Sequence, residues 1–129
     1  MLKRLTLLAM VSIGVVGLMR LTEAPSQAQS TTARAYYVAE FELTDPEGIK
    51  PYSTGVGATL KPFGGRFIVC GGKLVGLEGP KPGARTVIIE FPSMEQAEAW
   101  YNSPEYTALR PYRQRSGISR TYIIEGLQN

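Results

Sequence analysis

An arginine and a glutamate on two neighbouring predicted strands could together form a reaction site. Arg66 follows Gly64-Gly65 at the start of one strand, and Glu90 lies near the end of the next. A guanidinium binds carboxylates and enolates through paired hydrogen bonds, and a positioned carboxylate is a common general base. We therefore predict Arg66 as an anion holder and Glu90, or alternatively Glu40, as a catalytic base. The competing interpretation is that these charges form cross-strand or inter-subunit ion pairs.

Tyrosine, serine and cysteine side chains supply further candidates for a ligand pocket, because each can donate a hydrogen bond or react. Cys70 is the only cysteine, so no internal disulfide forms, and packing within a strand is its alternative role. Partial burial of the rings is the alternative for the tyrosines, and a helix cap is the alternative for the serine. The predicted ligand-binding residues are Tyr52, Arg66, Cys70, Tyr101, Ser103 and Tyr106.

Strands and helices in a regular order must position these residues. Alternating or apolar runs predict strands over residues 35–43, 66–71, 85–91 and 119–125. A first helix is capped by Thr44 or Asp45, or begins only at Pro51. Ser93 begins a second helix with a Ser-x-x-Gln pattern, and a third is expected over 103–115. This β-α-β-β-α-β order predicts an α+β ferredoxin-like sandwich, with helices on one face of an antiparallel sheet.

Side-chain alternation assigns one set of residues to the sheet face that the helices leave open. The opposite set holds bulkier side chains, which suit the helices better, although a register slip of one residue would reverse the assignment. The set assigned to the open face is Tyr36, Val38, Glu40, Glu42, Arg66, Ile68, Cys70, Thr86, Ile88, Glu90, Thr121, Ile123 and Glu125. Because its apolar members should not remain in water, two copies are expected to pack face to face as a homodimeric α/β barrel with a cavity between the sheets.

The front of the chain has the layout of a secretory signal peptide. Lys3 and Arg4 precede an apolar run, and Ser26-Gln27-Ala28 supplies small residues before the expected cut. The apolar run is shorter than the roughly 20 residues of a spanning helix, so a retained anchor is the weaker alternative. We expect a signal peptide over 1–28, a flexible leader over 29–34 and one ferredoxin-like domain over 35–127. The cleaved protein is expected to be periplasmic or secreted and not bound to a membrane.

Composition excludes several classes of function. There is no histidine, which removes histidine-based triads and histidine-ligated haem. The chain has 14 Lys+Arg and 11 Asp+Glu, of which the signal segment holds three and one, so the cleaved chain has a net charge of +1. This balance argues against nucleic acid as a partner. The glycine pairs fit no phosphate loop, and we predict no cofactor and no metal. One basic cluster is interpreted as cations near a helix end: Arg110, Arg113, Arg115 and Arg120.

A series of short segments, in their order along the chain, carries a resemblance to a known family. They are Tyr37-Val38-Ala39-Glu40, Thr44-Asp45-Pro46-Glu47, Tyr52, Thr59-Leu60, Gly64-Gly65-Arg66-Phe67, Gly71-Gly72, Leu77-Glu78-Gly79, Ile89-Glu90-Phe91-Pro92-Ser93, Ala99-Trp100-Tyr101, Ser103-Pro104-Glu105-Tyr106 and Ile124-Glu125-Gly126. The chain thereby resembles the domain-of-unknown-function family thirteen-thirty. The resemblance implies a dimeric α/β-barrel fold, shared with small monooxygenases and muconolactone-isomerase-like proteins. No catalytic residue can be inferred from the resemblance, because the family has no settled activity.

Three functions are compatible with these observations. The favoured one is an exported homodimer that binds a small organic molecule between or beside its sheets, an anionic one if Arg66 contacts it. The second is a cofactor-free isomerase, lyase or monooxygenase that uses Glu90 as base and Arg66 as anion holder. The third is a purely structural dimer.

Overall fold

The computed structural model describes residues 32–128. Its elements are β1 (Ala35–Leu43), α1 (Lys50–Leu60), the 3-10 turn η1 (Lys61–Phe63), β2 (Arg66–Cys70), β3 (Arg85–Phe91), α2 (Met94–Tyr101), α3 (Pro104–Arg115) and β4 (Gly117–Glu125). The predicted signal peptide and residues 29–31 of the predicted leader lie outside the described residues. Within residues 32–128, no helix has the length and apolar character that crossing a membrane requires.

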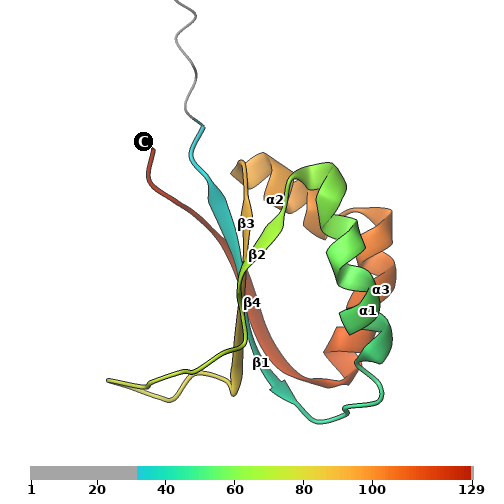
Figure 1. The fold of residues 1–129 in the computed structure, drawn as a ribbon, viewed down its shortest axis with the longest axis vertical. Coiled ribbons are helices and arrows are strands. Elements are labelled where there is room, and N and C mark those ends of the chain that lie inside the picture. Colours follow the sequence, from blue (N-terminus) through green and yellow to red (C-terminus); the bar gives the residue numbers. More distant parts are fainter. Residues whose placement is uncertain (1–31, 129) are drawn as a thin grey trace, which may run out of the picture.

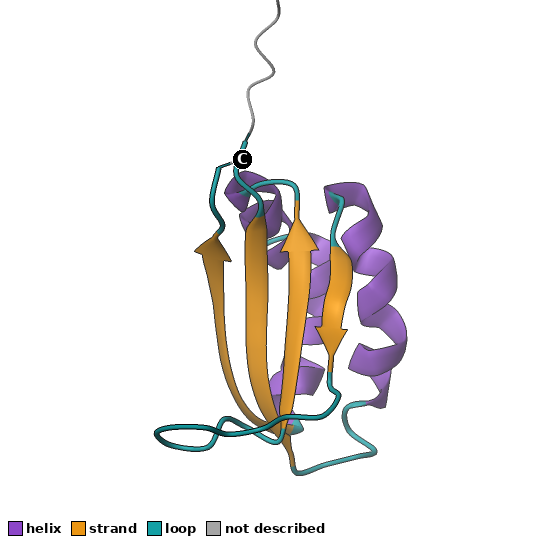
Figure 2. Ribbon diagram, turned by 60° about the vertical axis from the view of Figure 1, so that its left-hand side comes forward, coloured by secondary structure: helices purple, strands orange, loops and turns teal. Residues whose placement is uncertain are grey.

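The strands form one antiparallel sheet in the order β2-β3-β1-β4. Helices α1, α2 and α3 all lie on the same side of this sheet, and the other face is bare (Figures 1 and 2). The segment that joins β2 to β3 extends past the end of the sheet toward the bare side (Figure 1). This arrangement confirms the predicted ferredoxin-like α+β fold.

Two of the three helix starts have the predicted side-chain caps, which are Ser93 for α2 and Ser103 for α3. The Ser93 hydroxyl accepts a hydrogen bond from the Gln96 backbone N–H at 3.1 Å and begins α2. Asp45 does not cap α1: its carboxylate accepts from the Gly48 N–H at 3.0 Å within a preceding turn. Helix α1 itself begins at Lys50 without a side-chain cap, with proline in its first turn. The predicted start at Pro51 is therefore closer to the observed start than the one capped by Thr44 or Asp45.

A β-bulge in β2 changes the direction in which the end of this strand faces. The register shifts between Phe67 and Val69, where Ile68 is an extra residue. Cys70 consequently pairs with Val87 and lies with it on the helix side of the sheet, where both line a pocket. The prediction that Cys70 lies on the open face is therefore wrong, because one inserted residue inverts the alternation of every residue after it.

The alternation of β4 is also opposite to the prediction. Ile123 pairs with the buried Tyr37, so it lies on the helix side. Tyr122 and Ile124 lie on the open side, where they are 46% and 53% exposed. Hydrophobicity could not choose between these faces, because β4 carries apolar residues on both. The residues that the prediction places wrongly on the open face of this strand are Thr121, Ile123 and Glu125.

The core between the sheet and the helices is aromatic. Trp100 of α2 is fully buried, and the centre of its ring system lies 4.0 Å from that of Tyr106 and 5.1 Å from that of Tyr37. Its indole Nε1 donates a hydrogen bond to Thr59 Oγ1 at 2.9 Å, so its polar atom is satisfied. Trp100 therefore fixes two tyrosine rings whose hydroxyl groups remain available for another role.

Candidate functional site

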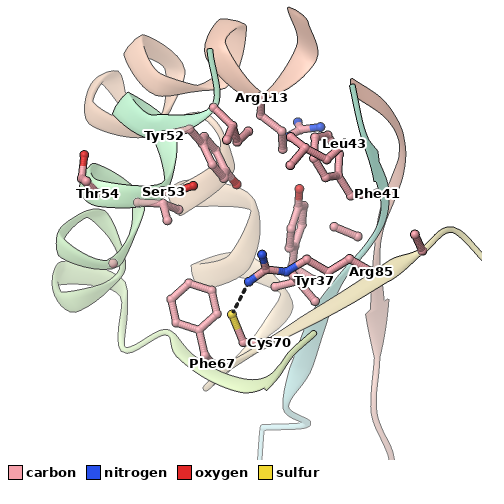
Figure 3. Close-up of a pocket in the computed structure, with 16 residues that line it drawn as sticks. Tyr37, Phe41, Leu43, Tyr52, Ser53, Thr54, Phe67, Cys70, Arg85 and Arg113 are labelled. Carbon is pink, nitrogen blue, oxygen red and sulfur yellow. Dashed lines mark hydrogen bonds between the residues drawn. The ribbon is translucent and has the colours of Figure 1, made fainter. Parts of the chain in front are cut away.

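A cavity of about 370 Å³ lies between the helix side of the sheet and α1 (Figure 3). Helix α1 packs mainly against α3 rather than closely on the sheet, which leaves this space. Gly57 of α1 lines the cavity, and a side-chain Cβ at this position would meet no atom within 4 Å. The apolar walls are formed by Ala39, Phe41, Leu43, Val56, Phe67 and Val87.

One end of the pocket carries a buried cation, Arg113 of α3, which is 5% exposed. Its Nη1 donates a hydrogen bond to Ser119 Oγ at 2.6 Å, whereas its buried Nε has no hydrogen-bond partner. Among residues 32–128, no salt bridge joins Arg113 to a carboxylate. A buried cation without a counter-charge is costly. This end of the pocket therefore favours an anion.

Three tyrosine hydroxyls surround the same end. The Tyr106 hydroxyl lies 3.4 Å from the Tyr37 hydroxyl and 3.3 Å from the Tyr52 hydroxyl. Both distances exceed the roughly 2.5–3.0 Å of a good O–H···O hydrogen bond, so the hydroxyls satisfy one another poorly. Each phenol brings one donor and can also accept, whereas a guanidinium brings five donors and no acceptor. Together with Arg113, the cluster has an excess of donors and suits an oxygen acceptor such as a carboxylate.

The ionisation of this cluster follows from its burial. Burial raises the pKa of Tyr37 and of Tyr52 well above that of a free phenol, and the adjacent Tyr106 raises both further. Burial lowers the pKa of Arg113, but its interactions with the three tyrosines outweigh this and raise its pKa above the usual value. At neutral pH the hydroxyls of Tyr37 and Tyr52 are therefore neutral and lie beside the positive charge of Arg113.

Buried neutral tyrosines predict a loss of stability at high pH. In the unfolded chain a phenol ionises near pH 10, whereas the pKa values of Tyr37 and Tyr52 are raised in the folded protein. Above about pH 10 the unfolded state binds fewer protons, so the free energy of unfolding falls as the pH rises, by up to about 1.4 kcal/mol per pH unit for each tyrosine. Urea denaturation at a series of alkaline pH values measures this slope.

The Tyr52→Phe variant is expected to show a shallower alkaline slope than the wild type, because one raised pKa is removed. Tyr112→Phe serves as the control, since Tyr112 is exposed and lies outside the cluster. A Tyr52→Phe slope equal to that of the wild type would contradict the burial of a neutral phenol at this position.

The other end of the pocket is its mouth, where the lining residues are exposed. Cys70 and Arg85 meet here, and Arg85 Nη2 donates a hydrogen bond to Cys70 Sγ at 3.3 Å (Figure 3). In the figure the guanidinium of Arg85 points into the pocket, with Tyr37 between it and Arg113. The pocket thus has a buried positive end, apolar walls and a second cation at the mouth.

Arg66 and Glu90 lie on the opposite, open face of the sheet. Arg66 Nε and Nη2 each lie 2.9 Å from Glu90 Oε1, and Arg34 Nη1 lies 3.0 Å from the same oxygen. Arg120 Nε likewise donates to Glu40 Oε2 at 2.6 Å across the sheet. These contacts have the geometry of cross-strand ion pairs, which is the competing interpretation of these charges. The catalytic roles of Arg66 and Glu90 stay a prediction.

The other predicted ligand-binding residues fall into three places. Tyr52 and Cys70 line the pocket, and Tyr106 lies behind it with its hydroxyl against that of Tyr52. Ser103 caps α3, where its hydroxyl accepts from the Tyr106 N–H at 3.3 Å. Tyr101 lines a separate, more open hollow beside β4 and stacks under Arg110, whose Cζ lies 4.2 Å from the ring centre.

Sequence reasoning missed most of the pocket lining, and the missed residues that bring a charge or a phenol are Tyr37, Arg85 and Arg113. The sequence interpretation treats Arg113 as a helix-end cation, but it lies seven residues after Tyr106 in the same helix. Residues at this spacing share one helix face, so Arg113 could have been placed beside the core. Tyr37 belongs to the alternating set that faces the helices, which indicates burial but not a polar role for its hydroxyl.

Comparison with solved structures places this fold among small ferredoxin-like proteins. A protein of unknown function from Rhodopseudomonas palustris matches with 19% identity and a TM-score of 0.58, over 75% of this chain and 85% of that one. SnoaB, a cofactor-independent oxygenase from Streptomyces nogalater, matches with 12% identity and a TM-score of 0.53, over 76% and 97%. A dimeric ferredoxin-like protein of unknown function from Thermobifida fusca matches with 14% identity and a TM-score of 0.50, over 73% and 92%. At these identities the likeness concerns the fold alone.

The class of protein is therefore a ferredoxin-like α+β domain with a pocket between sheet and helices. The chain belongs to the family described as "Domain of unknown function (DUF1330)", whose sequence profile matches residues 34–127. The predicted family is thus confirmed. No curated protein sequence matches this chain.

Proposed function

We propose that this protein binds a small acidic organic molecule in the pocket between the sheet and α1. The observation that carries the proposal is Arg113: a guanidinium that is 5% exposed, has a buried Nε without a partner, and lines the cavity. A ligand carboxylate would supply the missing counter-charge and acceptor, and charge-assisted hydrogen bonds of this kind are the strong ones. In this proposal Arg113, and not the predicted Arg66, binds the anionic group of the ligand.

The dimensions and walls of the pocket support a small, mainly apolar ligand. Its volume of about 370 Å³ is near the low end of the range of small-molecule sites, which is about 300–1,000 Å³. Apolar walls with a few convergent polar groups are the usual composition of such sites. The hydroxyl groups of Tyr37 and Tyr52 add donors beside Arg113, so an acid should bind more tightly than its neutral amide.

A variant that enlarges a residue of the pocket lining tests this proposal. Gly57→Leu places a side chain in open space on α1, and leucine favours a helix more than glycine does, so the fold should survive. Benzoate is expected to raise the melting temperature of the wild type but not that of Gly57→Leu. The matched control is Ala58→Leu, an exposed position of the same helix that does not line the pocket, and it should respond like the wild type.

Two results would overturn the proposal. One is an equal response to benzoate in Gly57→Leu and in the wild type, which would place the ligand elsewhere. The other is an equal response to benzoate and to benzamide, because a site built around Arg113 must distinguish an anion from its neutral analogue.

We propose further that the protein is exported and that two copies pair through the open face. That face exposes Ile118, Tyr122 and Ile124, at 69%, 46% and 53%, and apolar surface of this kind marks interaction sites. The dimeric relative from Thermobifida fusca shares the fold. Native mass spectrometry of the protein recovered outside the cytoplasm is expected to give a dimer of chains that begin at residue 29. A monomer would contradict the pairing, and an intact first segment would contradict the cleavage.

The enzymatic alternative stays a prediction with a different test. It is motivated by the fold shared with SnoaB, a cofactor-independent oxygenase, and by the buried Glu90. It requires turnover that is lost in Glu90→Gln while the fold survives. The ion pairs of Glu90 with Arg66 and Arg34, on the face away from the pocket, make the binding function the better supported one. The purely structural alternative predicts that no acid stabilises the protein.

A further inference from the structure

Arg85 breaks the apolar pattern of the strand that carries it. In the register of the sheet it pairs with Phe41, so it lies on the side of β3 that faces the helices. The other residues on this side of β3 are Val87, Ile89 and Phe91. A charged residue in such a series is unusual, and places where a chain departs from its local pattern are often functional sites.

The neighbouring backbone makes room for this arginine. Gly71 has a positive φ of 73°, and a Cβ at this position would lie 3.3 Å from Arg85 Nε. The glycine therefore permits both a left-handed turn and the close passage of the Arg85 side chain. As a result the guanidinium points into the pocket mouth in Figure 3.

The lining of the pocket consequently holds two cations and no carboxylate. Arg113 lies at the buried end, and Arg85 at the mouth. Within the part of the chain that the structure describes, neither makes a salt bridge; the side-chain contact of Arg85 is to the Cys70 sulfur. One acid group leaves one of these charges uncompensated, whereas two acid groups compensate both.

We propose that the ligand is a short dicarboxylate with a flat, apolar core, an inference that rests on the proposed binding function. One carboxylate binds Arg113 and the tyrosine hydroxyls, and the second binds Arg85 at the mouth in place of Cys70. The aromatic side chains of Phe41, Tyr52 and Phe67 line the space between, and rings of this kind pack well against a planar molecule. The cavity of about 370 Å³ confines the core to one or two rings.

Matched pairs of ligands test the second acid group. The three benzenedicarboxylate isomers, which differ only in the spacing of the two acids, are compared with their monomethyl esters by isothermal titration at constant ionic strength. For at least one isomer we expect the wild type to bind the diacid about tenfold or more tightly than the monoester. In Arg85→Gln this difference should disappear, because the diacid loses far more affinity than the monoester does. Arg85→Lys should retain part of it, because the charge remains.

The outcomes separate this inference from the function on which it rests. If every diacid binds no better than its monoester, or if Arg85→Gln weakens diacid and monoester alike, the dicarboxylate inference is overturned while binding in the pocket stands. If neither diacids nor monoesters bind the wild type, both the inference and the proposed function are overturned. Because Arg85 is exposed at the mouth, its replacement is not expected to unfold the protein, and a melting curve of each variant checks this.

Discussion

Replacing Arg113 with methionine is expected to abolish tight binding of acids while leaving the fold intact. Charge-assisted hydrogen bonds contribute about 1.5–3 kcal/mol, so the affinity for benzoate should fall by roughly 10- to 100-fold. The free energy of unfolding should stay within about 1 kcal/mol of the wild type or rise, because a buried cation that lacks a carboxylate partner is removed. Isothermal titration and urea denaturation measure the two quantities on the same samples.

A matched control lies one helical turn away. Arg110 also belongs to α3, but it stacks on Tyr101 outside the pocket and donates to the Tyr101 carbonyl at 3.1 Å. Arg110→Met should therefore keep the affinity of the wild type. If Arg110→Met and Arg113→Met lose the same affinity, the effect comes from net charge and not from the pocket. A large loss of stability in Arg113→Met would instead show that the arginine supports the fold.

Replacing Trp100 with alanine is expected to produce the largest loss of stability. Trp100 is fully buried and packs against Phe91 at 5.3 Å, Tyr37 at 5.1 Å and Tyr106 at 4.0 Å between ring centres. Truncation of a buried tryptophan costs about 3–5 kcal/mol, which is a large part of the roughly 5–15 kcal/mol of a typical domain. Urea denaturation at neutral pH measures the change in the midpoint.

The less severe Trp100→Phe variant separates packing from the hydrogen bond. It keeps a ring in the core but removes the indole donor to Thr59 Oγ1, so its loss of stability should be smaller than that of Trp100→Ala. Because Trp100 holds Tyr106 in place, both variants should also weaken benzoate binding. A loss of less than about 1 kcal/mol in Trp100→Ala would contradict a core centred on this residue.

Much of the fold could be predicted because local signals agree with one another. Strand β3 begins at Arg85 and ends at Phe91 as predicted, since an apolar run lies between a proline-rich loop and Pro92-Ser93. The Ser93 and Ser103 caps mark two helix starts through side-chain chemistry that acts within three residues. Such signals require no knowledge of distant contacts, which explains their reliability here.

The faces of the sheet were harder to predict because they depend on pairing between strands. Nothing in the sequence around Ile68 announces the bulge that turns Cys70 toward the helices. In β4 both Ile123 and Ile124 are apolar, so hydrophobicity alone could not distinguish the core side from the open side. The error matters for function, because it assigned Cys70, which lines the pocket between the sheet and α1, to the open face.

The candidate site was only partly predictable for a related reason. Tyr52, Cys70 and Tyr106 were identified as ligand-binding candidates, and the structure brings the first two to the pocket and the third directly behind it. Arg113 was not, because its burial depends on how α3 packs near β1 and α1, elements far away in the sequence. An arginine at a helix end is ordinarily exposed, and only tertiary packing distinguishes this one.

A titration with benzoate followed by two-dimensional ¹H–¹⁵N NMR tests the central claim most directly, because it reports where the acid binds. We expect the largest shifts at the Arg113 Nε–H and at the backbone amides of Gly57 and Cys70, which line the pocket from three different elements. Shifts confined to Arg66, Glu90 and their neighbours on the open face, or no shifts at all, would contradict an acid-binding pocket between the sheet and α1.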